Sequence, residues 1–265
     1  MKKSFRSLND TTTPWIAAGL FCAVIVVHAA VPNEPRSGYE YLREESKEMQ
    51  DDEFMNPGMQ TVETGLALFN QEGQSGESCG SCHGEEGEKL DIQRIAMYPV
   101  FDEELKKPVT LQQRILMESE NRLGNKPLKY NGKESLALET FVRHLAVGEK
   151  VNVKTDGPMA PYFERGETLY HVRSGQLDMG CTNCHDFYAG MKIRANTLSQ
   201  GQSNGYPVYR LKNGRINAIQ DRFNQCYRQF RADGLEYGSD DAVALEVYVT
   251  ARGNGLPIET PGVRF

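Results

Sequence analysis

The chain has 265 residues and a mass of 29.8 kDa, which suffices for one large domain or for two domains of roughly 100 to 130 residues each. Hydrophobic residues make up 39% of the sequence and charged residues 25%, and large apolar residues occur along most of its length, which excludes wholesale disorder. The formal net charge of −6 argues against nucleic-acid binding, because such proteins need basic surfaces.

The first 30 residues have the composition of a Sec-type signal peptide. Three basic residues precede a largely apolar run at residues 15–27, and small residues follow at the expected cleavage site. The run is shorter than the roughly 20 residues that cross a bilayer as a helix, so an uncleaved anchor is the less favoured alternative. The sequence predicts export to the periplasm, with Cys22 removed together with residues 1–30.

The segment at residues 31–60 is rich in acidic residues and poor in large apolar ones. This composition predicts an acidic N-terminal arm and not a third domain. The arm is expected either to be solvated or to wrap a partner subunit.

Two copies of the motif C-x-x-C-H dominate the rest of the sequence, and they are formed by Cys79, Cys82 and His83 and by Cys181, Cys184 and His185. In this motif the two thiols attach haem covalently and the histidine binds its iron. One copy could be a redox or zinc site, but zinc would need ligands from distant parts of the chain. A structural disulfide is excluded because only Cys226 would remain after export. We therefore predict two covalently bound haem c groups.

The sequence around the two motifs repeats. A predicted helix containing Gly65 precedes the first motif, and one containing Gly166 precedes the second. The closing helices are predicted at the similar stretches 138–142 and 245–249. We expect a mainly α fold of two tandem cytochrome c-type domains, at residues 61–150 and 151–265, with long loops around the haems. Glycines and prolines at 148–161 mark the predicted boundary.

Eight basic residues and a single acidic one lie between Lys192 and Arg231, although the protein as a whole is acidic. They form either a solvated face, partners for the haem propionates, or an anion site. Cys226 lies in this stretch, four residues after Arg222, so the two would share one face of a helix. A nearby cation favours the reactive thiolate. Cys226 is also far enough beyond His185 to supply a distal iron ligand, whereas a buried inert cysteine is the alternative.

The chain resembles the SoxA family, the dihaem subunits of the exported enzyme L-cysteine S-thiosulfotransferase. The resemblance covers most of the chain after the signal, and it is carried by residues 50–58, 79–84, 98–101, 181–185, 222–228 and 251–261. The haem motifs are generic, whereas the Arg222-x-x-x-Cys226 element and the tail from Arg252 to Gly255 are more specific.

The resemblance implies that Cys226 is both the distal ligand of the second haem and the sulfur-carrying catalytic residue. It further implies that Arg222 binds thiosulfate and that Arg252 is a second cation at the site. The implied reaction joins thiosulfate to a cysteine of a SoxYZ-like carrier, and two electrons pass through haem to cytochrome c. The implied partner subunit is a SoxX-like monohaem cytochrome.

The first half departs from the family pattern. Dihaem members usually have a distal cysteine in a segment resembling residues 113–115 and beyond, and Glu118 takes its place here. Met117 is adjacent and is the predicted axial ligand, because a thioether commonly binds haem iron. Met97 and His144 are the rival ligands, and Met117 could instead be a core residue. Two rival functions also stay open: a thiosulfate dehydrogenase forming tetrathionate, and a plain dihaem electron carrier.

Overall fold

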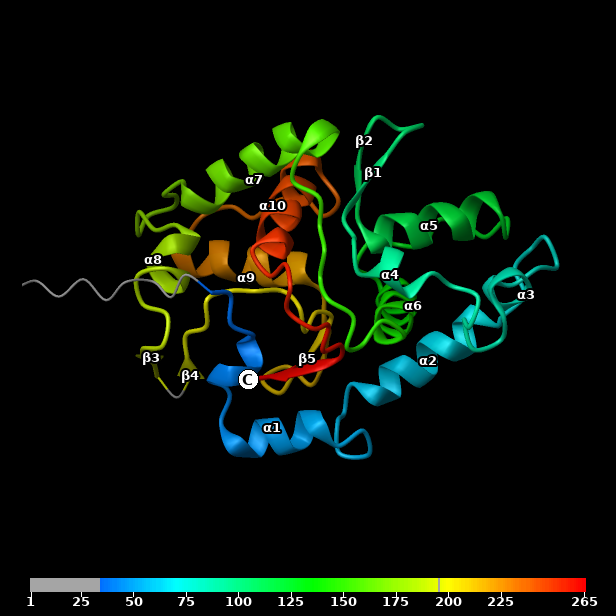
Figure 1. The fold of residues 1–265 in the computed structure, drawn as a ribbon, viewed down its shortest axis with the longest axis horizontal. Coiled ribbons are helices and arrows are strands. Elements are labelled where there is room, and N and C mark those ends of the chain that lie inside the picture. The colour runs from blue at the N-terminus through cyan, green and yellow to red at the C-terminus, as the bar shows by residue number, and fades with distance from the viewer. Residues whose placement is uncertain (1–33, 195) are drawn as a thin grey trace, which may run out of the picture. The chain divides into compact units, whose positions relative to one another are not determined.

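Two pairs of crossing helices form the frame of the protein (Figure 1). The computed structural model describes residues 34–194 and 196–265, so the predicted signal at residues 1–30 and Cys22 lie outside the described residues. In the first pair α2 (Met59–Phe69) packs against α6 (Lys133–His144), and in the second α7 (Ala160–His171) packs against α10 (Asp240–Ala251). The repeat seen in the sequence thus forms the same helix pair twice.

Each crossing depends on one glycine. A Cβ atom on Gly65 would lie 2.1 Å from the carbonyl oxygen of Ala137, and one on Gly166 would lie 2.0 Å from that of Ala244. No side chain fits such a gap, so glycine alone permits the two backbones to approach this closely. Phe141 and Tyr248, one turn further along α6 and α10, pack beside the same crossings.

In each half the first helix of the pair is followed by a haem motif on a single helical turn, α3 (Cys79–His83) after α2 and α8 (Cys181–His185) after α7. The start of α3 is capped by Ser78, whose hydroxyl accepts a hydrogen bond from the Ser81 amide. At the start of α8 the side chain of Asn183 accepts a hydrogen bond from the Gly180 amide. These caps fix the turns that carry the paired cysteines.

Further along each half a hairpin leads into a helix, and these segments of the two halves correspond to each other. The hairpin is β1 (Val100–Asp102) with β2 (Lys107–Val109) before α5 (Leu111–Asn121), and β5 (Val208–Arg210) with β6 (Arg215–Asn217) before α9 (Ile219–Phe230). Val100 pairs with Val109 as Val208 pairs with Asn217. The segments therefore match residue by residue without a gap. The remaining elements are η1 (Gly38–Tyr41), α1 (Glu44–Asp51), α4 (Ile92–Ile95), η2 (Gly157–Met159), β3 (Lys192–Ile193), β4 (Asn196–Thr197) and β7 (Gly262–Arg264).

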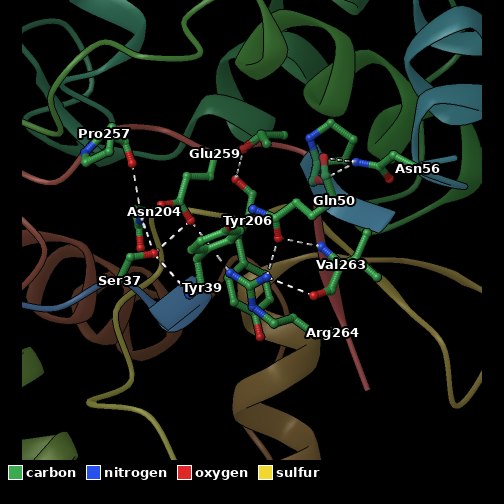
Figure 2. Close-up of polar contacts among 12 residues, drawn as sticks. Ser37, Tyr39, Gln50, Asn56, Asn204, Tyr206, Pro257, Glu259, Val263 and Arg264 are labelled. Carbon is green, nitrogen blue, oxygen red and sulfur yellow. Dashed lines mark hydrogen bonds and ion pairs between the residues drawn. The ribbon is translucent and has the colours of Figure 1, made fainter. Parts of the chain in front are cut away.

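The acidic arm is bound to the C-terminal part of the same chain, as Figure 2 shows. Gln50 in α1 accepts hydrogen bonds from the Val263 amide at 2.9 Å and from Arg264 at 2.6 Å. Asn56 donates to the carbonyl oxygen of Pro261 at 2.9 Å, and the Ser37 hydroxyl lies 2.7 Å from a Glu259 carboxylate oxygen. The arm therefore wraps β7, which itself runs parallel to β5.

The connection between the halves runs antiparallel to the tail. The Val151 amide donates to the Leu256 carbonyl oxygen at 2.9 Å, and Gly148 donates to Ile258 at 3.0 Å. The Asn254 side chain accepts from the Val153 amide and donates to its carbonyl oxygen. Part of the family-specific tail thus has a structural role. The described residues pack as one compact unit, and the domain limits at 61–150 and 151–265 stay a prediction.

A buried charge cluster joins the two closing helices. Glu139 of α6 accepts a hydrogen bond from Gln112 at 2.6 Å, and Glu246 of α10 accepts one from Gln220 at 2.9 Å, so the two carboxylates have equivalent partners. Arg143 donates to the Ile95 carbonyl oxygen at 2.8 Å, and its charge acts on both carboxylates. Burial, together with the charge of Glu246, raises the pKa of Glu139 to about 8, and burial raises that of Glu246 to about 7.

The described residues contain no helix with the length and apolar character needed to traverse a lipid bilayer.

The glycine crossing is tested by Gly166→Ala. In an ordinary helix this change stabilises by up to about 1 kcal/mol. Here the added methyl group meets the Ala244 backbone, and we expect a loss of about 1 to 3 kcal/mol, measured by thermal unfolding of the haem-loaded protein. Glu167→Ala at the neighbouring exposed position is the control and should leave stability nearly unchanged. A Gly166→Ala protein as stable as wild type would contradict the close crossing.

The buried carboxylates predict that stability falls as the pH rises. Their pKa values are raised above the ordinary value of 4.5, so between about pH 4.5 and 8 the folded chain holds protons that the unfolded chain has released. We expect the melting temperature to fall across this window and the slope to flatten in Glu246→Gln. Exposed Glu63→Gln on α2 is the control. Equal slopes in wild type and Glu246→Gln would count against the assignment.

Candidate functional site

Helix α9 places Cys226 opposite the second haem motif. Its charge acts on both motif thiols, Cys181 and Cys184, and the His185 side chain lies close enough to lower its pKa. The three cysteines and the histidine therefore surround one space, although Cys226 comes from a different helix. The predicted juxtaposition of Cys226 with the second motif is present in the structure.

The His185 ring is held in one orientation by the loop that follows α8. Its Nδ1 lies 2.8 Å from the carbonyl oxygen of Ser199, which can only accept a hydrogen bond. Nδ1 must therefore carry the proton, and Nε2 keeps the lone pair that a metal requires. Gly201 backs the ring so closely that a Cβ there would lie 2.8 Å from the His185 Cγ, and its φ of +82° also favours glycine.

Two arginines act on the Cys226 thiol. Burial alone would raise its pKa, but Arg222, His185 and Arg210 together outweigh burial, and the pKa falls to about 7. The interaction is mutual, because Cys226 is the main cause of the raised pKa of Arg222. At neutral pH a much larger fraction of Cys226 is therefore thiolate than in an ordinary cysteine.

Arg210 on β5 is the second of these cations. Its Nη1 donates to the Gln225 side chain at 3.0 Å, and its Nε is buried without a hydrogen-bond partner in the described chain. Burial, and after it the charge of Arg222, lowers the pKa of Arg210, so the two guanidinium groups are close enough to repel each other. Among residues 34–194 and 196–265, neither arginine forms an ion pair with a carboxylate.

Arg252 has different partners. Its guanidinium forms an ion pair with Asp186 at 2.7 Å and lies over the Tyr170 ring, 4.3 Å from the centroid. Asp186 directly follows His185, so Arg252 borders the second haem motif. One Arg252 nitrogen, Nη1, is buried without a partner in the part of the chain that the structure describes. The cations whose charge acts on Cys226 are Arg222 and Arg210.

The residues of the second motif suit haem c. The thiols of Cys181 and Cys184 stand one helical turn apart and would attach the haem, and His185 could bind its iron through Nε2. Cys226 lies next to His185 and would offer a soft sulfur ligand. The buried orphan nitrogens of Arg210 and Arg252 are donors suited to carboxylate or oxyanion groups.

The first half contains the same framework with different side chains. The ungapped match of α5 to α9 places Glu118 at the position of Cys226 and Arg114 at that of Arg222. Glu118 lies near Cys79, since its charge contributes to the raised pKa of that thiol after burial and Cys82. Arg114 forms ion pairs with Asp102 and, at 3.5 Å, with Glu118.

A cavity of about 570 Å³ lies in the first half, and Met117, Glu118, Arg114 and Phe101 are among the residues that line it. Met117 is the only sulfur-bearing residue in that lining and also packs against the first hydrophobic core. The rival ligands lie elsewhere. Met97 packs against the core, and Nδ1 of His144 lies 2.8 Å from the Thr260 carbonyl oxygen. Met117 as axial ligand stays a prediction.

Sequence reasoning missed Arg210 and Tyr206 as neighbours of Cys226. Arg210 was counted in the basic stretch, but nothing in its local sequence separated it from the exposed Arg215. The signal was present in the repeat, because Tyr98-Pro99-Val100 recurs as Tyr206-Pro207-Val208 and leads to Asp102 and Arg210 at equal distances.

Comparisons with known proteins agree with this arrangement. The family model of the SoxA/TsdA cytochrome c domain matches residues 64–151 and 165–258. The L-cysteine S-thiosulfotransferase subunit SoxA of Pseudaminobacter salicylatoxidans is 38% identical over 247 residues, covering 91% of this chain and 86% of that protein. The protein of the same name from Rhodovulum sulfidophilum is 40% identical over 233 residues, covering 88% of this chain and 81% of its own.

The fold agrees with a solved structure as well. A chain from the crystal structure of SoxXA from P. pantotrophus aligns with a TM-score of 0.81 and 38% identity, and 87% of each chain is covered. The expected mainly helical cytochrome c fold is thereby confirmed. With its two matched segments and these relatives, the chain belongs to the SoxA/TsdA cytochrome c family.

Proposed function

We propose that this chain is the haem subunit of an L-cysteine S-thiosulfotransferase and conjugates thiosulfate to a cysteine of a SoxYZ-like carrier protein. The observation that carries the proposal is the approach of Cys226 to His185, with Arg222 acting on the same thiol. A thiolate beside a cation and a haem ligand suits a reaction that forms a sulfur–sulfur bond. The names of the SoxA relatives supply the substrate class.

The overall step balances as an oxidation. A carrier thiol and thiosulfate give a carrier S–S–SO₃⁻ group, one proton and two electrons. On this chain the Cys226 thiolate first bonds to the outer sulfur of thiosulfate, and two electrons leave. The carrier thiolate then attacks that outer sulfur, the bond to Cys226 breaks, and Cys226 is restored as thiolate. Arg222 holds the sulfonate end and keeps Cys226 ionised.

Cys181, Cys184, His185 and Cys226 would hold haem c, which would supply the redox centre that passes on the electrons of this oxidation. Ser199 holds the proton on the His185 Nδ1, which keeps Nε2 available as the proximal ligand. We propose a second haem c at Cys79, Cys82 and His83, so that the chain carries two. Met117 is the proposed iron ligand there, because it is the sulfur-bearing residue of the cavity that Glu118, whose charge acts on Cys79, also lines.

The proposal includes partners and a location. The matched crystal structure is titled as SoxXA, which supports a SoxX-like monohaem cytochrome as the partner subunit. A cytochrome c is the proposed electron acceptor, and the signal-like residues 1–30 support the periplasm as the location.

The proposed reaction is tested with thiosulfate, the carrier protein and oxidised cytochrome c. Removal of the nucleophile in Cys226→Ala should lower turnover by about 10³-fold or more, measured as cytochrome c reduction and as the mass of the carrier. Arg222→Gln should raise the KM for thiosulfate by about 10-fold or more. Arg228→Gln, on the exposed side of the same helix, is the matched control.

Three results would overturn this proposal. Conjugation at the wild-type rate by Cys226→Ala would remove the assigned nucleophile. Tetrathionate formed by the wild type without carrier would indicate a thiosulfate dehydrogenase. Electron transfer without any thiosulfate chemistry would indicate a plain electron carrier.

The proposed ligand set of the first haem is tested by magnetic circular dichroism of the oxidised protein. We expect one low-spin haem with thiolate and histidine ligands and one with methionine and histidine. Met117→Leu should abolish the methionine-to-iron charge-transfer band and leave the thiolate band in place. Met97→Leu is the matched control. Two thiolate-ligated haems, or a high-spin first haem in the wild type, would contradict Met117.

A further inference from the structure

The two halves hold the same four side-chain positions around their haem motifs. From hairpin to helix the corresponding pairs are Tyr98 and Tyr206, Asp102 and Arg210, Arg114 and Arg222, and Glu118 and Cys226. The equal length of the hairpins and the equal start of the following helices make this correspondence free of gaps. The side chains at these four positions therefore show how the second half differs chemically from the first.

In the first half the arginine is neutralised from both sides. Arg114 is bonded to Asp102 on the hairpin and, at 3.5 Å, to Glu118 on its own helix. The adjoining cavity is also lined by Glu103 and Glu104. With Asp102 and Glu118 this lining holds four carboxylates against the three guanidinium groups of Arg94, Arg114 and Arg122, so the net charge is negative and would repel a dianion.

In the second half the charge at the corresponding positions is positive. Arg210 replaces the neutralising carboxylate and is hydrogen-bonded at 3.0 Å to Gln225 of α9, the helix that carries Arg222 and Cys226. The charges of both arginines act on Cys226. Neither has a carboxylate partner in the described chain, and the Arg210 Nε is a buried donor without an acceptor. Two adjacent guanidinium groups repel each other, and an unpaired buried donor is unfavourable, so both observations indicate an anion that completes the site.

We infer that Arg210 is a second substrate-binding residue, whose guanidinium binds the sulfonate end of thiosulfate together with Arg222 and selects for a dianion. The inference rests on the proposed function, since it takes thiosulfate as the substrate. It differs from the role that the sequence resemblance gave to Arg252, because Arg252 is paired with Asp186 and stacked on Tyr170.

Gln225 explains how Arg210 is held for this task. It accepts a hydrogen bond from the Arg210 Nη1 at 3.0 Å and sits next to Cys226 in sequence, so the guanidinium is tied to the helix that carries the thiol. Arg215 provides the contrast, because it is the direct cross-strand neighbour of Arg210 in the same hairpin but is exposed. The two arginines therefore make a matched pair for an experiment.

The test measures the dissociation constant for thiosulfate by calorimetry on the oxidised, haem-loaded protein without carrier. Arg210→Gln should weaken binding by about 10-fold to 100-fold, as the loss of a charge-assisted contact does. The affinity of Arg210→Lys for thiosulfate should lie between those of the wild type and Arg210→Gln, because lysine keeps the charge but lacks the planar guanidinium group. Arg215→Gln should match the wild type. Haem absorbance and thermal unfolding establish that each variant is folded. If Arg210→Gln does not fold, the affinity of Arg210→Lys for thiosulfate is the deciding measurement.

The outcomes separate this inference from the proposed function. Absence of thiosulfate binding by the wild type would sink both. Wild-type binding that Arg210→Gln leaves unchanged would overturn the role of Arg210 alone. A shift of the second haem's reduction potential in Arg210→Gln with unchanged thiosulfate affinity would assign Arg210 to a haem propionate and would also overturn the inference. Weakened thiosulfate binding with an unchanged reduction potential of the second haem would support it.

Discussion

The fold depends on two places where helix backbones nearly touch. Gly65 and Gly166 let α2 and α7 lie directly on the carbonyl oxygens of Ala137 and Ala244, and any side chain there would push the helices apart. Each crossing sets where the following haem-motif turn begins. The opposing hairpin and helix then complete the site. The crossing of α7 and α10 therefore supports both sides of the site, since α7 contacts α8, which carries His185, and α10 contacts α9, which carries Cys226.

Duplication of this unit lets one half be compared with the other under matched geometry. The same positions hold an acid, an arginine and an acid in the first half, but two arginines and a thiol in the second. The charge of the site is therefore decided by few side chains on a shared frame. Glu139, Arg143 and Glu246 line one small cavity between the closing helices of the two halves, and the raised pKa values of the two carboxyl groups mean that their ionisation is unfavourable there.

Much of this arrangement was predictable from sequence because it follows short-range patterns. The paired haem motifs, the helices around Gly65 and Gly166, and the spacing of Arg222 and Cys226 all lie within a few turns of chain. Contacts between distant segments were not predictable. Arg210 reaches Cys226 through the packing of a hairpin on a helix, and Arg252 could be placed near the second motif but not assigned to Asp186. The arm's attachment to β7 likewise has no local signal.

That attachment bears on how the protein matures. The hydrogen bond from Val263 to Gln50 joins residues 213 positions apart, and both haem motifs lie inside the loop that it closes. Contacts of such long range form late, because the entropy of closing the loop must be met first. We therefore expect the arm and β7 to meet after the two halves have formed around their own haem motifs through shorter-range contacts. In the completed fold Cys82 is still exposed and Cys79, Cys181 and Cys184 are only half-buried, so this contact ties the two ends of the described chain together without sealing either motif.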